Sequence, residues 1–197
     1  MTIIIYFIAC VLAYLIGSVS SAIVISKLLN LPDPRLEGSK NPGATNVLRL
    51  GGKKAGILTL FGDILKGVLP VLAAKLYGFN SVGLSLVAFS VFIGHLYPVF
   101  FQFKGGKGVA TAFGFLAVLN GMIAASLAAV WLIVAILFRY SSLASLVCAV
   151  CAPFITWYFT DWNYTVLMIA TSALLIFRHR KNIRNLIAGK EGKLFQH

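Results

Sequence analysis

The chain has 197 residues, of which 59% are hydrophobic and only 11% are charged. A soluble domain usually carries about 25% charged residues, so the composition excludes an ordinary soluble fold and predicts an integral membrane protein. The net charge of +12 does not indicate nucleic acid as a partner, because the basic residues lie between apolar runs, where they set topology and meet anionic headgroups or phosphate groups. We expect one all-α integral membrane domain over residues 1–197, in contact with membrane lipids.

Six apolar runs follow one another along the chain. They cover Ile3–Ile25, Ala55–Ala74, Ser81–Phe101, Val109–Phe138, Leu143–Phe159 and Tyr164–Phe177. A helix needs about 20 apolar residues to cross a bilayer, so the fourth run is too long for one straight span, and the turn dipeptide Asn120-Gly121 is its expected break. Seven membrane helices result. The piece 109–119 would be only about 16 Å long, so it either extends into 104–108 or is re-entrant.

The basic residues predict the orientation, because Lys and Arg concentrate on the cytoplasmic side of a membrane protein. With the N-terminus outside, the segment 27–54, the stretch 104–107 and the tail from Arg178 all become cytoplasmic. No Lys or Arg precedes Lys27, so the first run is expected to be an uncleaved signal anchor. The C-terminus is therefore expected to be cytoplasmic.

The first candidate site is the stretch 38–49, which reads G-S-K-N-P-G-A-T-N-V-L-R. Its glycines let backbone N–H groups approach an anion, and Ser39, Thr45 and Asn46 add further donors. Arg49 offers a planar fork that matches phosphate oxygens. A polar turn between two membrane helices is the alternative, although such a turn does not need this combination of residue types.

The second candidate site is the stretch 104–108, in which Lys104 and Lys107 alternate with Gly105, Gly106 and Gly108. Helix-compatible residues follow, so the pattern indicates a phosphate held at a helix N-terminus. It is not a nucleotide P-loop, which requires G-x-x-x-x-G-K-[ST]. A basic loop that only sets membrane topology is the alternative.

Three ionisable residues lie inside apolar runs. Asp63 and Lys66 are three residues apart and are expected to form an intramembrane ion pair with a structural role. His95 lies near the end of the third run. It could donate to a phosphate, act as a base or serve helix packing, and the sequence leaves these three roles open.

The tail 178–184 is basic, and His179 and Asn182 would share one face if it were helical. An interfacial basic anchor would have the same composition, so both interpretations stand.

Cys148 and Cys151 form a C-x-x-C in an apolar run, which we interpret as helix packing instead of redox chemistry. The three histidines are scattered, so no metal site and no cofactor are predicted. Neither H-x-x-x-x-D nor G-x-S-x-G occurs.

Three segments resemble the signature motifs of a known family. They are G-S-x-N-P-G-A-T-N-V-x-R at 38–49, G-H-x-x-P-V-F-F-x-F-K-G-G-K-G-V-A-T at 94–111 and R-H-R-K-N-I-R-N-L at 178–186. They resemble those of the bacterial acyl-phosphate:glycerol-3-phosphate acyltransferases of the PlsY type, and the resemblance extends over essentially the whole chain. It implies seven helices in the bacterial inner membrane with the motifs on the cytoplasmic side.

The resemblance also implies a reaction. A fatty acyl group passes from acyl phosphate to the sn-1 hydroxyl of glycerol 3-phosphate, which gives lysophosphatidic acid and phosphate in the first step of membrane phospholipid synthesis. Neither acyl-CoA nor acyl carrier protein serves directly as donor, no cofactor is needed, and an enzyme that forms acyl phosphate is an expected upstream partner.

The site residues follow from the motifs and from their position in this chain. The catalytic candidates are Ser39, Arg49, Lys104, His179 and Asn182, and the substrate-binding candidates are Thr45, Asn46, His95, Gly105, Gly106, Lys107, Gly108 and Ser142. Glu191 is expected to stabilise the tail through its basic cluster.

Two other classes of protein remain as alternatives. A transporter of phosphate or of a phosphorylated metabolite would use basic loops as a selectivity vestibule, but it would need its anion-binding residues near the membrane midplane, whereas these candidates all fall on one predicted face. A scaffold protein of lipid synthesis would have no turnover.

Overall fold

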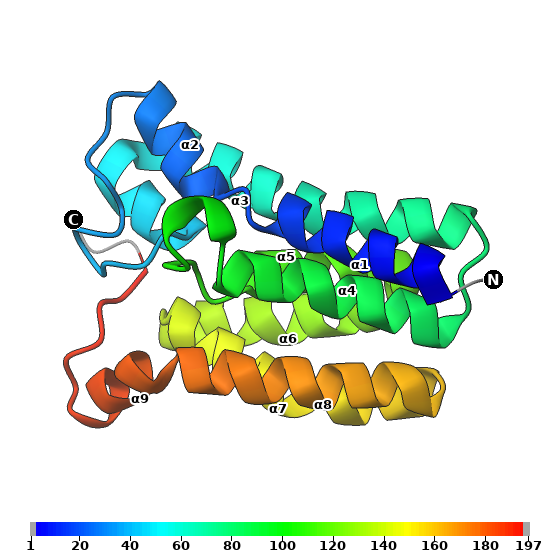
Figure 1. Ribbon diagram of the computed structural model, residues 1–197. Helices are drawn as coiled ribbons and strands as arrows, with labels where there is room; N and C mark the ends of the chain where they lie inside the picture. Colours follow the sequence, from blue (N-terminus) through cyan, green and yellow to red (C-terminus); the bar gives the residue numbers. More distant parts are fainter. Residues whose placement is uncertain (1–2, 195–197) are drawn as a thin grey trace. The chain divides into compact units, whose positions relative to one another are not determined.

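A computed structural model describes residues 3–194, and this part of the chain is helical, as the composition predicts. The helices are α1 (Ile3–Gly17), α2 (Ser21–Leu28), α3 (Ala44–Leu76), α4 (Ser81–Leu96), a 3-10 turn η1 (Val99–Phe101), α5 (Val109–Leu119), α6 (Gly121–Phe138), α7 (Ser141–Phe159), α8 (Trp162–Arg178) and α9 (Arg180–Ile187) (Figure 1). They form two compact units, one up to Leu119 and one from Asn120 onward.

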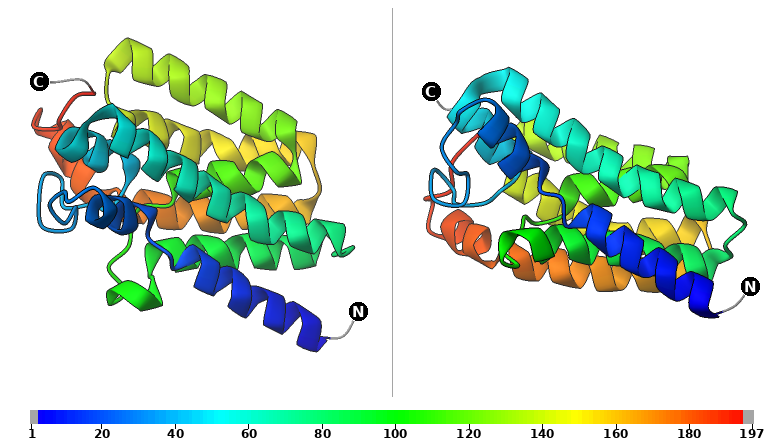
Figure 2. Two further views of the ribbon diagram at one scale, coloured as in Figure 1. Left: turned by 90° about the horizontal axis from the view of Figure 1, so that it is seen from above. Right: turned by 45° about the horizontal axis from the view of Figure 1, so that its top comes forward.

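In the first unit, α1 packs along α4, while α3 packs on α5 and also contacts α1, α2 and α4 (Figures 1 and 2). Glycines allow these close approaches. A Cβ on Gly94 of α4 would collide with the carbonyl of Tyr14 on α1, and a Cβ on Gly67 of α3 would collide with the carbonyl of Thr111 on α5. Small residues at helix crossings are typical of membrane proteins, where van der Waals packing drives association.

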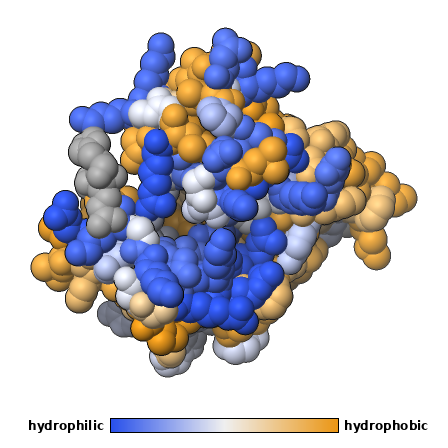
Figure 3. Space-filling model, turned by 90° about the vertical axis from the view of Figure 1, so that its left-hand side faces the viewer, coloured by the Kyte–Doolittle hydropathy of each residue, from blue (hydrophilic) through white to orange (hydrophobic). Residues whose placement is uncertain are grey.

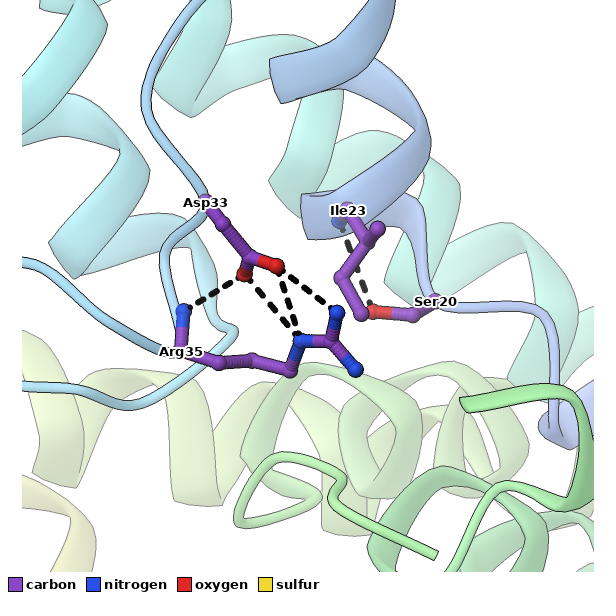
Figure 4. Close-up of polar contacts among 4 residues, drawn as sticks. All are labelled: Ser20, Ile23, Asp33 and Arg35. Carbon is purple, nitrogen blue, oxygen red and sulfur yellow. Dashed lines mark hydrogen bonds and ion pairs between the residues drawn. The ribbon is translucent and has the colours of Figure 1, made fainter. Parts of the chain in front are cut away.

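The first apolar run still forms one candidate membrane span, Ile3–Leu28, but it is broken into two helices instead of the one continuous helix expected over Ile3–Ile25. Helix α1 ends at Gly17, and α2 begins at Ser21, where Ser20 caps it by accepting from the Ile23 N–H at 3.5 Å (Figure 4). Ser18 stabilises the break, because its Oγ donates to the Tyr14 carbonyl and accepts from the Val99 N–H. Serine hydroxyls compete with backbone hydrogen bonds in this way.

Helix α3 is longer than the apolar run that predicts it. It begins at Ala44, so the second half of the stretch 38–49 forms its first turns. Gly52 interrupts the helix with φ 75° and ψ −175°, a conformation that is essentially restricted to glycine. The interruption separates the first two turns of α3, which carry Thr45, Asn46 and Arg49, from the long remainder of the helix.

The predicted break in the fourth run is confirmed. Asn120 adopts an extended conformation and caps α6, since its Oδ1 accepts from the Met122 N–H at 2.9 Å and the Ile123 N–H at 3.3 Å. Helix α5 begins at Val109 and does not extend into 104–108. Within residues 3–194, five segments could cross a membrane by length and composition: Ile3–Leu28, Ala44–Leu76, Ser81–Phe101, Gly121–Phe138 and Ser141–Phe159. Helices α5 and α8 are shorter apolar helices.

In the second unit, α7 packs against both α6 and α8, and α9 follows α8 as a short basic helix. Polar contacts tie α6 to α7, because Trp131 Nε1 donates to Ser145 Oγ at 3.1 Å and Cys148 Sγ donates to the Leu127 carbonyl. Cys148 and Cys151 are both unpaired thiols. The buried Cys148 therefore serves helix packing, as its place in an apolar run indicates.

Candidate functional site

The first candidate stretch is held in shape by one amide side chain. Asn46 is 2% exposed and lies in the first turn of α3. Its Oδ1 accepts from the Ser39 N–H at 2.9 Å, and its Nδ2 donates to the carbonyls of Pro34 at 2.9 Å and Glu37 at 3.1 Å. Gly38 passes so close, with φ 60°, that a Cβ there would collide with Asn46 Oδ1. This amide therefore fixes the loop 34–39 onto α3.

This geometry gives Asn46 a loop-fixing role, while its predicted contact with a bound phosphate stays a prediction. An amide nitrogen has two hydrogens, and both are used within the loop. The other three candidates of this stretch are arranged differently. Ser39 lies on the exposed loop, Thr45 is half-buried in the first turn of α3, and Arg49 is exposed one turn further along. Residues four apart lie on one helix face, so Thr45 and Arg49 share a face.

An ion pair closes the same loop at its other end. Arg35 donates from Nη2 to Asp33 Oδ2 at 2.7 Å and from Nε to both carboxylate oxygens at 3.1 Å, and the Arg35 N–H also donates to Oδ1 (Figure 4). These hydrogen bonds from Arg35 lower the pKa of Asp33 below its ordinary value. The carboxylate therefore stays charged at neutral pH, and the loop keeps this turn.

The second candidate stretch precedes a helix, as expected, because α5 begins directly after it. Its glycines allow close backbone packing. The Gly106 N–H donates to the His95 carbonyl at 3.1 Å, and Gly108 has φ 88° with the Phe92 ring against it. The Gly106 N–H is thus used within the protein, and the role of Gly106 in binding phosphate stays a prediction that rests on the close backbone packing.

The structure brings the two candidate stretches together within the first unit. A Cβ on Gly106 would lie 3.0 Å from the carbonyl oxygen of Pro42, so the glycine-rich segment touches the loop that leads into α3. Both loops lie at the end of this unit opposite Ile3 (Figures 1 and 2). Lys104 is exposed there and Lys107 is half-buried. An anion at this end would meet lysine side chains and the N-terminus of α5.

The ionisable residues inside the apolar helices of this unit form one cluster. Lys66 Nζ lies 2.9 Å from Asp63 Oδ1, which confirms the predicted ion pair, and it also donates to the Val19 carbonyl. His95 is 6% exposed, and its Nδ1 lies 3.7 Å from Asp63 Oδ1. On its other side, His95 Nε2 lies against the Gly106 backbone.

The second unit gathers the third group of candidates. His179 is buried between α8 and α9, and its Nδ1 is 2.8 Å from the Leu175 carbonyl. Because a carbonyl can only accept, Nδ1 carries the hydrogen. Glu191 Oε1 accepts from Asn182 Nδ2 and from Ser142 Oγ, each at 2.6 Å. Ser142 is buried at the start of α7.

Glu191 thus has a different role from the one expected. The sequence predicts that it stabilises the tail through basic side chains, whereas its carboxylate joins an amide and a hydroxyl from two elements. The sequence shows only a single acidic residue after a basic stretch, and this pattern does not tell whether the carboxylate bonds to basic side chains or to an amide and a hydroxyl. Among residues 3–194, no group of three His, Cys, Asp or Glu side chains is placed to hold a metal ion.

Polar residues gather at one end of each unit. In the first unit this end carries the loops described above, and in the second it carries α9 and the segment after it. The end-on view shows many hydrophilic side chains, with hydrophobic ones among and beside them (Figure 3). The helices themselves expose large apolar side chains such as Phe7, Phe61 and Ile136, which suits contact with lipid.

This architecture is that of a multi-pass helical membrane protein with glycine-rich and basic loops outside its apolar helices. Residues 7–189 match the family described as glycerol-3-phosphate acyltransferase. The chain belongs to this family.

Relatives that bear the family's name are similar over nearly the whole chain. A glycerol-3-phosphate acyltransferase of Burkholderia thailandensis is 56% identical over 192 residues, which are 95% of each protein. One of Burkholderia multivorans is 53% identical over 189 residues, covering 94% of this chain and 89% of the relative. The family thus favours an enzyme over a transporter or scaffold.

Two crystal structures of PlsY, an integral membrane glycerol 3-phosphate acyltransferase, have the same fold. The glycerol 3-phosphate form has a TM-score of 0.92 at 40% identity and covers 97% of this chain and 99% of that one. The lysophosphatidic acid form has a TM-score of 0.88 at 40% identity, with 95% and 94% covered.

Proposed function

We propose that this protein transfers a fatty acyl group from acyl phosphate to the sn-1 hydroxyl of glycerol 3-phosphate, producing lysophosphatidic acid and phosphate. The observation that carries the proposal is the similarity to PlsY in its glycerol 3-phosphate form, at 40% identity over 97% of the chain. The paired loops of the first unit support it, because both substrates carry a phosphate group and the loops combine lysines, an arginine and a helix N-terminus.

Glycerol 3-phosphate is proposed to bind by its phosphate at the segment 104–108. The first N–H groups of a helix have no partner within the helix, and the helix dipole favours an anion there. Lys104 and Lys107 add charge beside the start of α5. Gly105, Gly106 and Gly108 allow the segment to pack closely, and His95 supports it from α4.

The acyl transfer is proposed to proceed by direct attack of the substrate hydroxyl on the acyl-phosphate carbonyl. A new ester C–O bond forms, and the bond between the acyl carbon and the phosphate oxygen breaks. Arg49 and Lys104, with Ser39 and Thr45 as further donors, would stabilise the oxyanion and the leaving phosphate. A strong protein base is not required, because phosphate is a good leaving group. A phosphate oxygen of the substrate can take the hydroxyl proton.

In the second unit, His179, Asn182 and Ser142 are proposed as further site residues. The bond from His179 Nδ1 to Leu175 fixes the ring and its tautomer. Glu191 holds the amide of Asn182 and the hydroxyl of Ser142 in place. Such supporting contacts keep reacting groups within the narrow geometry that catalysis needs.

The membrane placement is part of the proposal. Seven segments would cross or enter the bilayer of a bacterial inner membrane, with α5 and α8 as the two short ones, the N-terminus outside and the C-terminus cytoplasmic. The distribution of Lys and Arg supports this orientation. Acyl phosphate would then come from an upstream enzyme on the cytoplasmic side, and the product would remain in the membrane.

The test is an assay of purified protein with palmitoyl phosphate and glycerol 3-phosphate. We expect 1-acylglycerol 3-phosphate and inorganic phosphate in equal amounts. Arg49→Ala serves as the impaired variant, and Lys53→Ala serves as a matched control on the same helix. The absence of acyl product, together with glycerol 3-phosphate uptake into vesicles that contain the protein, would contradict the proposal and favour a transporter.

A further inference from the structure

Asp63, Lys66 and His95 are buried together in the first unit, although each can carry a charge. Their exposed fractions are 2%, 6% and 6%. Burying a charge is costly unless it is paired and hydrogen-bonded. A structural ion pair explains Asp63 and Lys66, but it does not explain why the carboxylate also faces a histidine.

Lys66 fixes the carboxylate of Asp63. Its ammonium group lies 2.9 Å from Asp63 Oδ1 and donates to the Val19 carbonyl, also at 2.9 Å. Val19 lies in the break between α1 and α2, where its carbonyl is outside both helices. The lysine thus joins the carboxylate to the backbone at the break between α1 and α2.

His95 connects this carboxylate to the glycine-rich segment. Its Nδ1 lies 3.7 Å from Asp63 Oδ1. Its carbonyl accepts from the Gly106 N–H at 3.1 Å, and its Nε2 lies so close to Gly106 that a Cβ there would collide with the ring. His95 therefore contacts the segment through both its main chain and its side chain.

We propose that Asp63 is a positioning residue, which acts through the His95 imidazole to set the position of the segment 104–108 and thereby the affinity for the phosphate of glycerol 3-phosphate. This inference rests on the proposed function of that segment. It differs from a purely structural ion pair, in which Asp63 and Lys66 only compensate each other's charge.

A double variant separates the two roles. Asp63→Asn alone leaves the Lys66 ammonium buried without a carboxylate, so it is expected to destabilise the protein under either role. Asp63→Asn with Lys66→Met removes both charges while keeping similar volumes, and such replacements are often neutral for stability. A structural pair predicts that both stability and substrate affinity recover. A positioning role predicts that only stability recovers.

The experiment measures the thermal midpoint, kcat and both KM values for the wild type and for this double variant. We expect a midpoint above that of Asp63→Asn measured alongside, because no unpaired charge stays buried although the Val19 carbonyl loses its donor. We also expect a kcat within about twofold of the wild type, an unchanged KM for acyl phosphate and a KM for glycerol 3-phosphate raised at least about tenfold. The matched control is Thr59→Ala, since Thr59 is a buried polar residue of α3 whose hydroxyl donates to the Ala55 carbonyl. This control should keep the wild-type KM.

Asp63→Glu gives a second reading if the double variant does not fold. It keeps the charge but moves the carboxylate by one methylene group, so a positioning role still predicts a raised KM for glycerol 3-phosphate. A normal KM for glycerol 3-phosphate in whichever of these variants folds would overturn this inference but not the proposed function. Wild-type protein that does not acylate glycerol 3-phosphate would overturn the proposed function and the inference with it.

Discussion

At the scale of single residues, Arg49 is exposed on the first turns of α3 and shares a helix face with Thr45. Arg49→Ala should lower kcat by about 10²–10³, which is the usual loss for one oxyanion donor, while KM for glycerol 3-phosphate changes little. Arg49→Lys should not restore kcat, because a point charge cannot reproduce a bidentate fork. Steady-state kinetics check this, and wild-type kcat in Arg49→Lys would mean that the arginine only supplies charge.

Asn46 is expected to act on stability. Asn46→Asp keeps the shape but replaces the donor that bonds to the carbonyls of Pro34 and Glu37. Leaving buried partners unsatisfied costs about 1–3 kcal/mol, so the thermal midpoint should fall and the loop 34–39 should become sensitive to protease. Asn41→Asp, between this loop and the start of α3, is the control. An unchanged midpoint in Asn46→Asp would contradict the loop-fixing role.

The sequence predicts which stretches could bind an anion, but it does not predict which hydrogen-bond partner each donor in them has. Gly, Lys and Arg in short stretches indicate an anion site from their chemistry alone. The bonds of Asn46 depend on how the loop folds back onto α3, and the bond from Gly106 to His95 depends on how the segment between α4 and α5 folds back onto the end of α4. Both are tertiary contacts, so no local pattern distinguishes these donors from ligand-binding ones.

At the scale of elements, the interruption of α3 depends on Gly52. Its φ of 75° with ψ −175° should make Gly52→Ala destabilising by about 1–3 kcal/mol, even though a Cβ there meets no atom within 4 Å. Gly121→Ala, at the start of α6, also meets no atom and should be neutral or slightly stabilising. Thermal unfolding in detergent compares the two, and equal midpoints would contradict a conformational role for Gly52.

The two helix breaks show which elements the sequence can predict. Asn120 caps α6 through neighbouring N–H groups, so a local signal was sufficient. The break after Gly17 is stabilised by Ser18 accepting from Val99 and by Lys66 donating to Val19. These partners are far away in sequence, and hydropathy alone therefore predicts one continuous helix.

At the scale of the whole molecule, the positive-inside rule gives a topology that labelling can test. In a background with the three cysteines replaced, single cysteines at Lys40, Lys107 and Lys190 should react from the cytoplasmic side. Cysteines at Gly78 and Asn163 should react from the opposite side. Labelling of positions 107 and 78 from the same side would contradict the seven-segment arrangement.

The choice of acyl donor tests the central claim most directly. Purified protein is given glycerol 3-phosphate with either palmitoyl phosphate or palmitoyl-CoA, and kcat/KM is measured for each donor. We expect turnover with palmitoyl phosphate and none with palmitoyl-CoA, because the loops of the protein offer phosphate-binding groups and the sequence lacks H-x-x-x-x-D. Equal or faster turnover with palmitoyl-CoA would contradict the central claim.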